Sequence, residues 1–174
     1  MKVLIALDDS ECSDLAFDSC TERSWTDLAE FRIITVVEPA YIQAPIAGVY
    51  GPPMIEAQIE FEKYCRERVN EKVEKMKSFH PKNAVTGDTL VGPAAECILD
   101  EAVAWNADLI VVGSHGRKGL SRFFLGSVAE RVAGHAPCSV EIVKHKHPAP
   151  EESVSQNKQD SPSIPLSVGG KVLI

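Results

Sequence analysis

Short apolar runs alternate with longer segments of mixed polarity over the first 144 residues, and this alternation restricts the fold more than any other feature. The clearest runs, 2–7 (KVLIAL) and 108–112 (DLIVV), are typical of parallel strands covered by helices on both faces. We expect strands at 2–7, 31–37, 84–91, 108–112 and 139–143, and helices at about 10–23, 54–79, 93–105 and 127–135. This order predicts an α/β fold with a five-stranded parallel doubly wound sheet and helices on both faces.

The second crossover is longer than the others. Residues 38–53 hold four prolines and two glycines, a composition that favours a functional loop over a plain connector. The helix after it has an apolar stripe, broken by charges, that we expect to run from Ile55 through Ile59 and Val69 to Met76.

The ends of the first and fourth strands are candidates for a ligand site. In doubly wound sheets, ligands bind beyond the carboxyl ends of the strands, where the strand order reverses. The first strand runs into Asp8 and the fourth into Gly113. We therefore expect Asp8 and Gly113 to lie side by side.

A glycine-rich loop follows the fourth strand: 113–116 (GSHG), nine further residues, then Gly126 and Ser127. A glycine directly after a buried strand allows a positive φ and lets a ligand approach the main chain. The helix that begins at Gly126 and Ser127 offers unpaired amides and the positive end of its dipole to a phosphate. From His115 to Arg131 there are four basic side chains and one acidic, so the loop should attract a polyanion.

Several loop residues have two interpretations. Arg117 and Lys118 either contact phosphate or form a solvated charge pair. His115 has no carboxylate or cysteine nearby in sequence, so we expect its main chain to matter more than its ring. Ser127 and Glu130 match a capping box, which would stabilise the helix start with or without a ligand.

Asp8 also has two interpretations. As an acidic side chain at a strand end beside a phosphate loop, it suits an acceptor for a ligand hydroxyl or amino group. It could instead cap the first helix, although Asp9 and Ser10 are better placed for capping.

The loop matches neither the Walker A motif nor the Rossmann G-x-G-x-x-G. Gly-x-x-Gly, nine residues and Gly-Ser at the end of the fourth strand resembles the nucleotide-binding signature of the universal stress protein family, in its ATP-binding branch. KVLIALDDS and APCSVEIVK are similar to that family's terminal segments. The resemblance covers residues 1–144 as one domain, and it implies a Rossmann-like fold of the adenine nucleotide alpha hydrolase type.

The resemblance also implies a role for each matching residue. Asp8 would read the adenine or ribose end, Val36 would pack against the base, and Val112 would touch the nucleotide through its backbone. The ribose and triphosphate would be lined by Gly113, Gly116, Gly126, Ser127 and Val128. With Arg117, these residues make up the expected ATP site. Mg²⁺ would be carried on the phosphates, with no metal ligand from the protein and no catalytic residue.

The end of the chain carries two further expectations. In the family the last strand commonly pairs with its copy in a second subunit, and Val140, Ile142 and Val143 would form such an edge here, so a homodimer is expected. Residues 145–174 are rich in Pro, Ser, Gln, Asn and Lys and are predicted to form a flexible tail outside the domain.

Composition excludes several classes of partner. The formal net charge of −7 argues against nucleic acid, because that binding depends on Lys and Arg neutralising phosphates. No apolar stretch approaches a membrane span and no signal-peptide pattern is visible, so we expect a cytoplasmic protein without a membrane contact. The five widely spaced cysteines, without a C-x-x-C pair, are expected to be reduced thiols.

We interpret the chain as an ATP-binding regulatory or stress-response protein with an unidentified protein partner. Any ATP hydrolysis should be slow, because no carboxylate or histidine stands out as a base. The alternative is a dimeric stress-response interaction module that does not use nucleotide, although the complete glycine set counts against it. An adenylating enzyme ranks third, because such enzymes resemble S-G-G-x-D-S after the first strand, where this chain reads ALDDSE.

Overall fold

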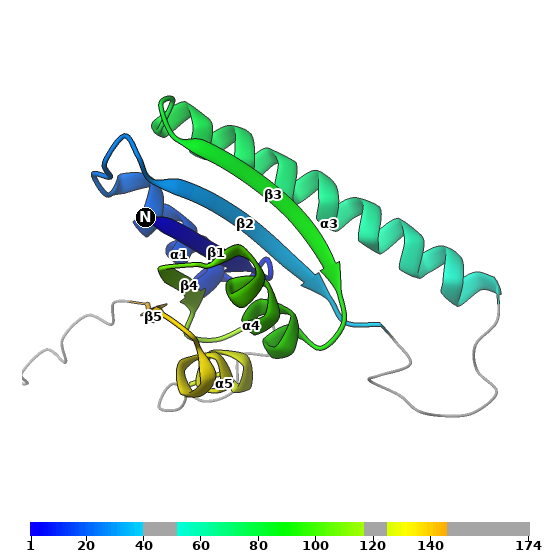
Figure 1. Cartoon of the computed structure of the whole chain (residues 1–174). Coiled ribbons are helices and arrows are strands. Elements are labelled where there is room, and N and C mark those ends of the chain that lie inside the picture. The colour runs from blue at the N-terminus through cyan, green and yellow to red at the C-terminus, as the bar shows by residue number, and fades with distance from the viewer. Residues whose placement is uncertain (40–51, 117–124, 146–174) are drawn as a thin grey trace, which may run out of the picture.

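The computed structural model describes residues 1–39, 52–116 and 125–145, and it shows a five-stranded sheet between two layers of helices (Figure 1). The elements are β1 (Lys2–Leu7), α1 (Glu11–Glu22), β2 (Glu30–Val37), α3 (Pro52–Phe79), β3 (Ala84–Val91), α4 (Ala94–Trp105), β4 (Leu109–Gly113), α5 (Ser127–His135) and β5 (Ser139–Val143). These bounds confirm the predicted α/β class and each predicted strand and helix. Most of the predicted loop at 38–53 and of the tail at 145–174 lies outside the described residues.

The sheet is parallel throughout, with the strand order β3-β2-β1-β4-β5. β1 is the central strand, and its Ile5 lies opposite Ile33 of β2 and Val111 of β4. From β1 the chain builds outward to β3 on one side, and then returns to build β4 and β5 on the other. This reversal confirms that the ends of β1 and β4 are neighbours, as the sequence predicted.

Each face of the sheet is covered by a pair of helices. α1 and α3 cover one face, with Phe17 and Met76 in its core, and α4 and α5 cover the other, with Ile98 and Val132 in its core (Figure 1). Successive side chains of a strand point to opposite faces, so neighbouring residues of β1 enter different cores. Residues 3–5 have no exposed surface as a result, which is why β1 is apolar after Lys2.

The apolar stripe of α3 is shorter than its sequence suggested. Its buried residues are Cys65, Val69, Val73 and Met76, whereas Ile55 and Ile59 are each 60% exposed. At ~1.5 Å per residue the 28 residues of α3 span roughly 42 Å, and at ~3.3 Å per residue the 8 residues of β3 span roughly 26 Å. The first turns of α3 therefore extend past the carboxyl ends of the strands (Figure 1). Among the described helices, none is long and apolar enough to cross a membrane.

Gly87 lies in the middle of β3 and does not interrupt the strand. Its backbone faces α3 so closely that an added Cβ would lie 2.6 Å from methyl groups of both Val69 and Val73. The missing side chain therefore sets the distance between α3 and the sheet.

We expect Gly87→Ala to lower the free energy of unfolding by about 1–3 kcal/mol, because the stiff β-branched side chains facing it have little room to turn away. Urea unfolding measures the change. The control is Gly134→Ala in α5, where an added Cβ meets nothing within 4 Å and helix propensity should raise stability by about 0.5–1 kcal/mol. Equal stability of the two variants would contradict the close approach of α3.

Cys20 of α1 is fully buried in the core between α1, α3 and the sheet. This burial raises the pKa of its thiol from 9.0 to about 11. The unfolded chain loses the thiol proton near pH 9, whereas the folded chain keeps it up to about pH 11. Stability should therefore fall as the pH rises through this window, with a slope of about 1.4 kcal/mol per pH unit from this thiol.

Denaturant unfolding of the natural chain and of Cys20→Ala, across the window in which the pKa values differ, measures this effect. The variant loses core packing at every pH, but it should lack the part of the slope that comes from the thiol. Parallel stability curves for the two proteins would show that Cys20 is not shielded from solvent.

Candidate functional site

Gly113 ends β4 where the start of α1 crosses it. A Cβ built on Gly113 would lie 2.7 Å from the carbonyl carbon of Cys12, a backbone atom of α1 that cannot move aside. Gly113 does not use the positive φ that a glycine allows, because it is the last residue of β4. Within the described ranges, Gly92 is the glycine with a positive φ, at 152°. Gly113 is thus required for the packing of α1 against β4.

Asp8 and Gly116 are in direct contact at the end of the sheet. An added Cβ on Gly116 would lie 2.5 Å from Oδ2 of Asp8, so the bare backbone of the loop makes room for the carboxylate. This contact brings the acid after β1 to the glycine loop after β4, as the strand order requires.

Ser10 holds the other oxygen of this carboxylate. Oδ1 of Asp8 accepts hydrogen bonds from the Ser10 amide at 3.2 Å and from the Ser10 hydroxyl at 2.6 Å. Ser10 is also the N-cap of α1, because its hydroxyl oxygen accepts a bond from the Ser13 amide at 3.2 Å. The capping interpretation of Asp8 is therefore wrong, and the carboxylate is directed toward the loop.

The start of α5 faces the same loop. Its N-cap is Gly126, with no hydrogen bond from a capping side chain, and Ser127 is the first helical residue. The predicted capping box is wrong, because Ser127 lies one position too late to cap. The Gly126 amide donates to the carbonyl of Ser114 at 2.8 Å, and a Cβ on Gly126 would lie 3.3 Å from that oxygen. The first amides of α5 therefore lie beside the backbone of Ser114, and no side chain caps this end of the helix.

The three valines of the predicted site lie on the α4 and α5 side of the sheet. Val36 and Val128 are half-buried against that core, and Val112 is 4% exposed within it. The side chain of Val112 is therefore enclosed, which leaves its backbone as the part that a ligand could reach. Val36 and Val128 keep some exposed apolar surface on the side where α5 begins.

Ser114 was not among the predicted site residues. Its side chain is 1% exposed, and its hydroxyl lies 3.0 Å from Nδ1 of His115 and 3.6 Å from Sγ of Cys12.

Ser10 is a second residue outside the predicted site. The carbonyl of His115 accepts a hydrogen bond from the Ser10 hydroxyl at 3.1 Å. The Asp-x-Ser spacing at 8–10, typical of a local side-chain turn, was the signal that could have revealed Ser10.

The basic residues predicted to attract phosphate are only partly described. Arg117, together with Lys118 and Arg122, lies outside the described residues. Arg131 is paired with Glu96 of α4 at 2.7 Å. Within the described ranges, no group of three or more His, Cys, Asp or Glu side chains is arranged to hold a metal ion.

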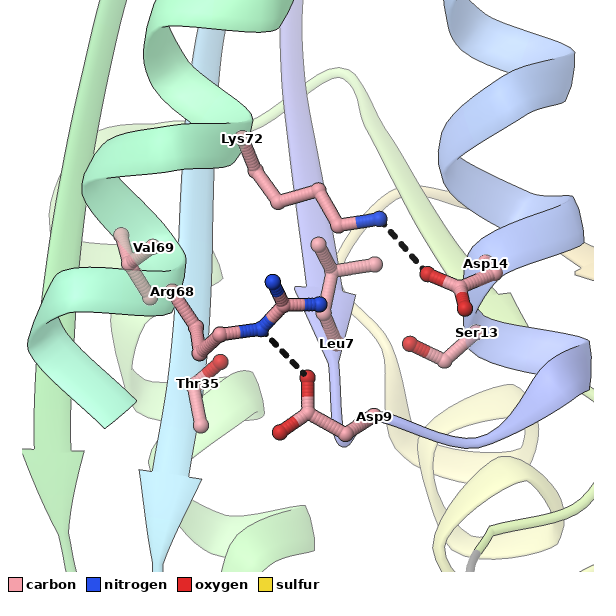
Figure 2. Close-up of a pocket in the computed structure, with 8 residues that line it drawn as sticks. All are labelled: Leu7, Asp9, Ser13, Asp14, Thr35, Arg68, Val69 and Lys72. Carbon is pink, nitrogen blue, oxygen red and sulfur yellow. Dashed lines mark hydrogen bonds and ion pairs between the residues drawn. The ribbon is translucent and has the colours of Figure 1, made fainter. Parts of the chain in front are cut away.

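A separate hollow lies on the opposite face, between α1 and α3 (Figure 2). Its two cations are both paired, Arg68 with Asp9 at 3.7 Å and Lys72 with Asp14 at 2.6 Å. Asp9 has a φ of 60°, so the ion pair with α3 holds a backbone conformation that is uncommon outside glycine. The ion pair therefore anchors the β1–α1 turn to α3. The hollow has no lining residue from the glycine loop, so it is distinct from the predicted phosphate site.

The chain is similar to known proteins over nearly all of its described part. A sequence profile of the universal stress protein family matches residues 1–144. A universal stress protein of Synechocystis is 29% identical over 153 residues, covering 83% of this chain and 97% of that protein. Universal stress protein A homolog 2 of Coxiella burnetii is 32% identical over 146 residues, covering 83% and 95%.

Solved structures show the same fold. The universal stress protein UspA from Lactobacillus plantarum has a TM-score of 0.68 at 22% identity, covering 82% of this chain and 97% of its own. A universal stress protein in complex with cAMP has a TM-score of 0.55 at 22% identity, covering 84% and 98%. A family member from Arabidopsis thaliana with AMP bound has a TM-score of 0.55 at 18% identity, covering 90% and 97%.

The profile match and the 32% identical relative span the sheet, both helix layers and the glycine loop. This chain belongs to the universal stress protein family.

Proposed function

We propose that this chain is a cytoplasmic regulatory protein that binds ATP, with Mg²⁺ on the phosphates, in the space between Asp8, Gly116 and the start of α5. The N-terminus of α5 without a capping side chain, where Gly126 packs beside the backbone of 114–116, is the observation that supports this proposal. Residues 1–144 would form the nucleotide-binding domain, and 145–174 a flexible tail.

The phosphates would bind at the start of α5. The amides of Ser127 and Val128 have no partner within the helix, and the helix dipole adds partial positive charge there. Gly126 keeps this end open, and Arg117 would supply a full positive charge. A phosphate chain carrying Mg²⁺ would suit this set of amides and positive charge.

The nucleoside would bind toward the end of β1. The Asp8 carboxylate can accept a hydrogen bond from a ribose hydroxyl or an adenine amino group, and Val36 offers apolar surface on the side where α5 begins. The cAMP and AMP complexes of family members support the class of ligand, because both molecules carry adenine and ribose.

Slow hydrolysis fits the described residues better than rapid turnover. The ring of His115 lies against the Ser114 hydroxyl, and the Asp8 carboxylate is tied to Ser10. In the proposed binding mode the carboxylate would be engaged by the nucleoside, away from the phosphates at the start of α5, where an attacking water would lose its proton. We therefore propose that an unidentified partner protein responds to whether ATP is bound, and not to its hydrolysis.

Calorimetric titration of the full chain with Mg-ATP tests the nucleotide proposal. We expect binding, and we expect Ser127→Pro to weaken it by about tenfold or more relative to Ser127→Ala, since a hydrogen bond to a charged group contributes roughly 1.5–3 kcal/mol. Proline removes the amide donor and is favoured as the first residue of a helix, and Gly126 already has the extended conformation required before proline, with φ −63° and ψ 148°.

Ser127→Ala is the matched control, because it removes the hydroxyl and keeps the amide. Both variants should melt close to the natural chain. Absence of binding at millimolar ATP would reject the proposal, and equal affinities of the two variants would reject the role of the amide.

We also propose that the chain forms a homodimer through β5. β5 has β4 as its one neighbour in the described sheet, so its outer edge carries unpaired backbone groups. The carbonyl of Val143 accepts a hydrogen bond from Ser114 and faces inward. Because successive residues of a parallel strand direct their backbone groups to alternate sides, Val140 faces outward.

Light scattering after gel filtration tests this assembly. The natural chain should elute at twice its mass of 18.9 kDa, and Val140→Pro should shift it to the monomer by removing an outward-facing amide, as edge positions tolerate proline. Val140→Ala keeps the amide and should remain dimeric. A monomeric natural chain would refute the proposal.

A further inference from the structure

We propose that Ser10 is a positioning residue of the nucleotide site, whose hydroxyl fixes the Asp8 carboxylate relative to the glycine loop. This inference rests on the proposed function. It adds a residue that neither the loop signature nor the predicted site contains.

Ser10 restrains the carboxylate of Asp8 with two hydrogen bonds. Two donors of Ser10, its amide and its hydroxyl, converge on Oδ1 at 3.2 and 2.6 Å. Oδ2 is thereby turned toward Gly116, where an added Cβ would lie 2.5 Å from it. Rotation of the carboxylate would break the bonds to Ser10, so Ser10 determines which direction the acid presents to a ligand.

The same hydroxyl joins two segments that are far apart in the sequence. It lies 3.1 Å from the carbonyl of His115, a residue 105 positions away in the loop after β4. A hydroxyl has one proton and the two oxygens share it, with the shorter contact going to the charged group. Ser10 thus connects the acid and the loop, the two parts between which the nucleotide would bind.

Capping and positioning can be separated by substitution. As the N-cap, the Ser10 oxygen accepts a bond from the Ser13 amide, and glycine is tolerated at this position with little loss of stability. Glycine, however, has no hydroxyl to donate to Asp8 or to His115, and it adds no charge beside the carboxylate. Threonine keeps both abilities, and alanine has neither.

The experiment compares Ser10→Thr, Ser10→Gly and Ser10→Ala by Mg-ATP titration and by urea unfolding. Ser10→Thr should keep the affinity within about twofold of the natural chain. Ser10→Gly should keep the unfolding midpoint close to that of the natural chain but weaken binding by roughly tenfold or more, the scale of one lost hydrogen bond to a charged group. Ser10→Ala should lose both affinity and stability. If Ser10→Gly binds as tightly as the natural chain, the positioning role is refuted.

A double-mutant cycle with Asp8→Ala tests whether Ser10 acts through the carboxylate. Once Asp8 is removed, adding Ser10→Ala should change the affinity by less than about twofold. A purely structural role would leave the full effect of Ser10→Ala in place, and that result would overturn the proposal.

Hydrogen exchange separates a failure of this inference from a failure of the proposed function. If the natural chain does not bind ATP, the proposed function is wrong, but the connection from Ser10 to the loop can still be measured. Amides 114–116 should exchange faster in Ser10→Gly than in Ser10→Thr while the α3 amides exchange equally in both. Equal rates at 114–116 would overturn the positioning role without reference to any nucleotide.

Discussion

The pairing of the fully buried β1 with both β2 and β4 is the constraint on which the rest of this structure depends. It places the turn at 8–10 against the loop that follows Gly113. That turn makes contacts in three directions: Asp8 with Gly116, Asp9 with Arg68 of α3, and Ser10 with both α1 and the loop. Strand order therefore brings the two parts of the candidate site together, independently of the side chains within it.

The three glycines of the loop signature do different physical work. Gly113 admits the backbone of α1, Gly116 makes room for the Asp8 carboxylate, and Gly126 leaves the start of α5 without a cap. The position of Gly113 in the signature is thus accounted for by the packing of α1 on β4, whatever its role toward a ligand, and a side chain at Gly113 should disturb that packing.

Much of this architecture could be predicted from the sequence, because strands covered on both faces must be apolar throughout, as residues 3–5 are. Local patterns were less reliable where tertiary contacts decide. Ile55 and Ile59 continue a helical stripe, yet they have no sheet beneath them. Ser127 has the capping spacing, but it is the first residue of α5, and the N-cap is Gly126. The bond from Ser10 to His115 joins residues 105 apart, and no local pattern contains it.

The overhang of α3 gives this helix two parts of unequal stability. From Cys65 onward it has a buried side that faces the sheet, whereas the side chains of Ile55 and Ile59 in its first turns are each 60% exposed. Short stretches of helix without buried contacts are marginal in water. A local opening of these first turns would therefore leave the buried side of the helix in place, together with the anchor between Arg68 and Asp9.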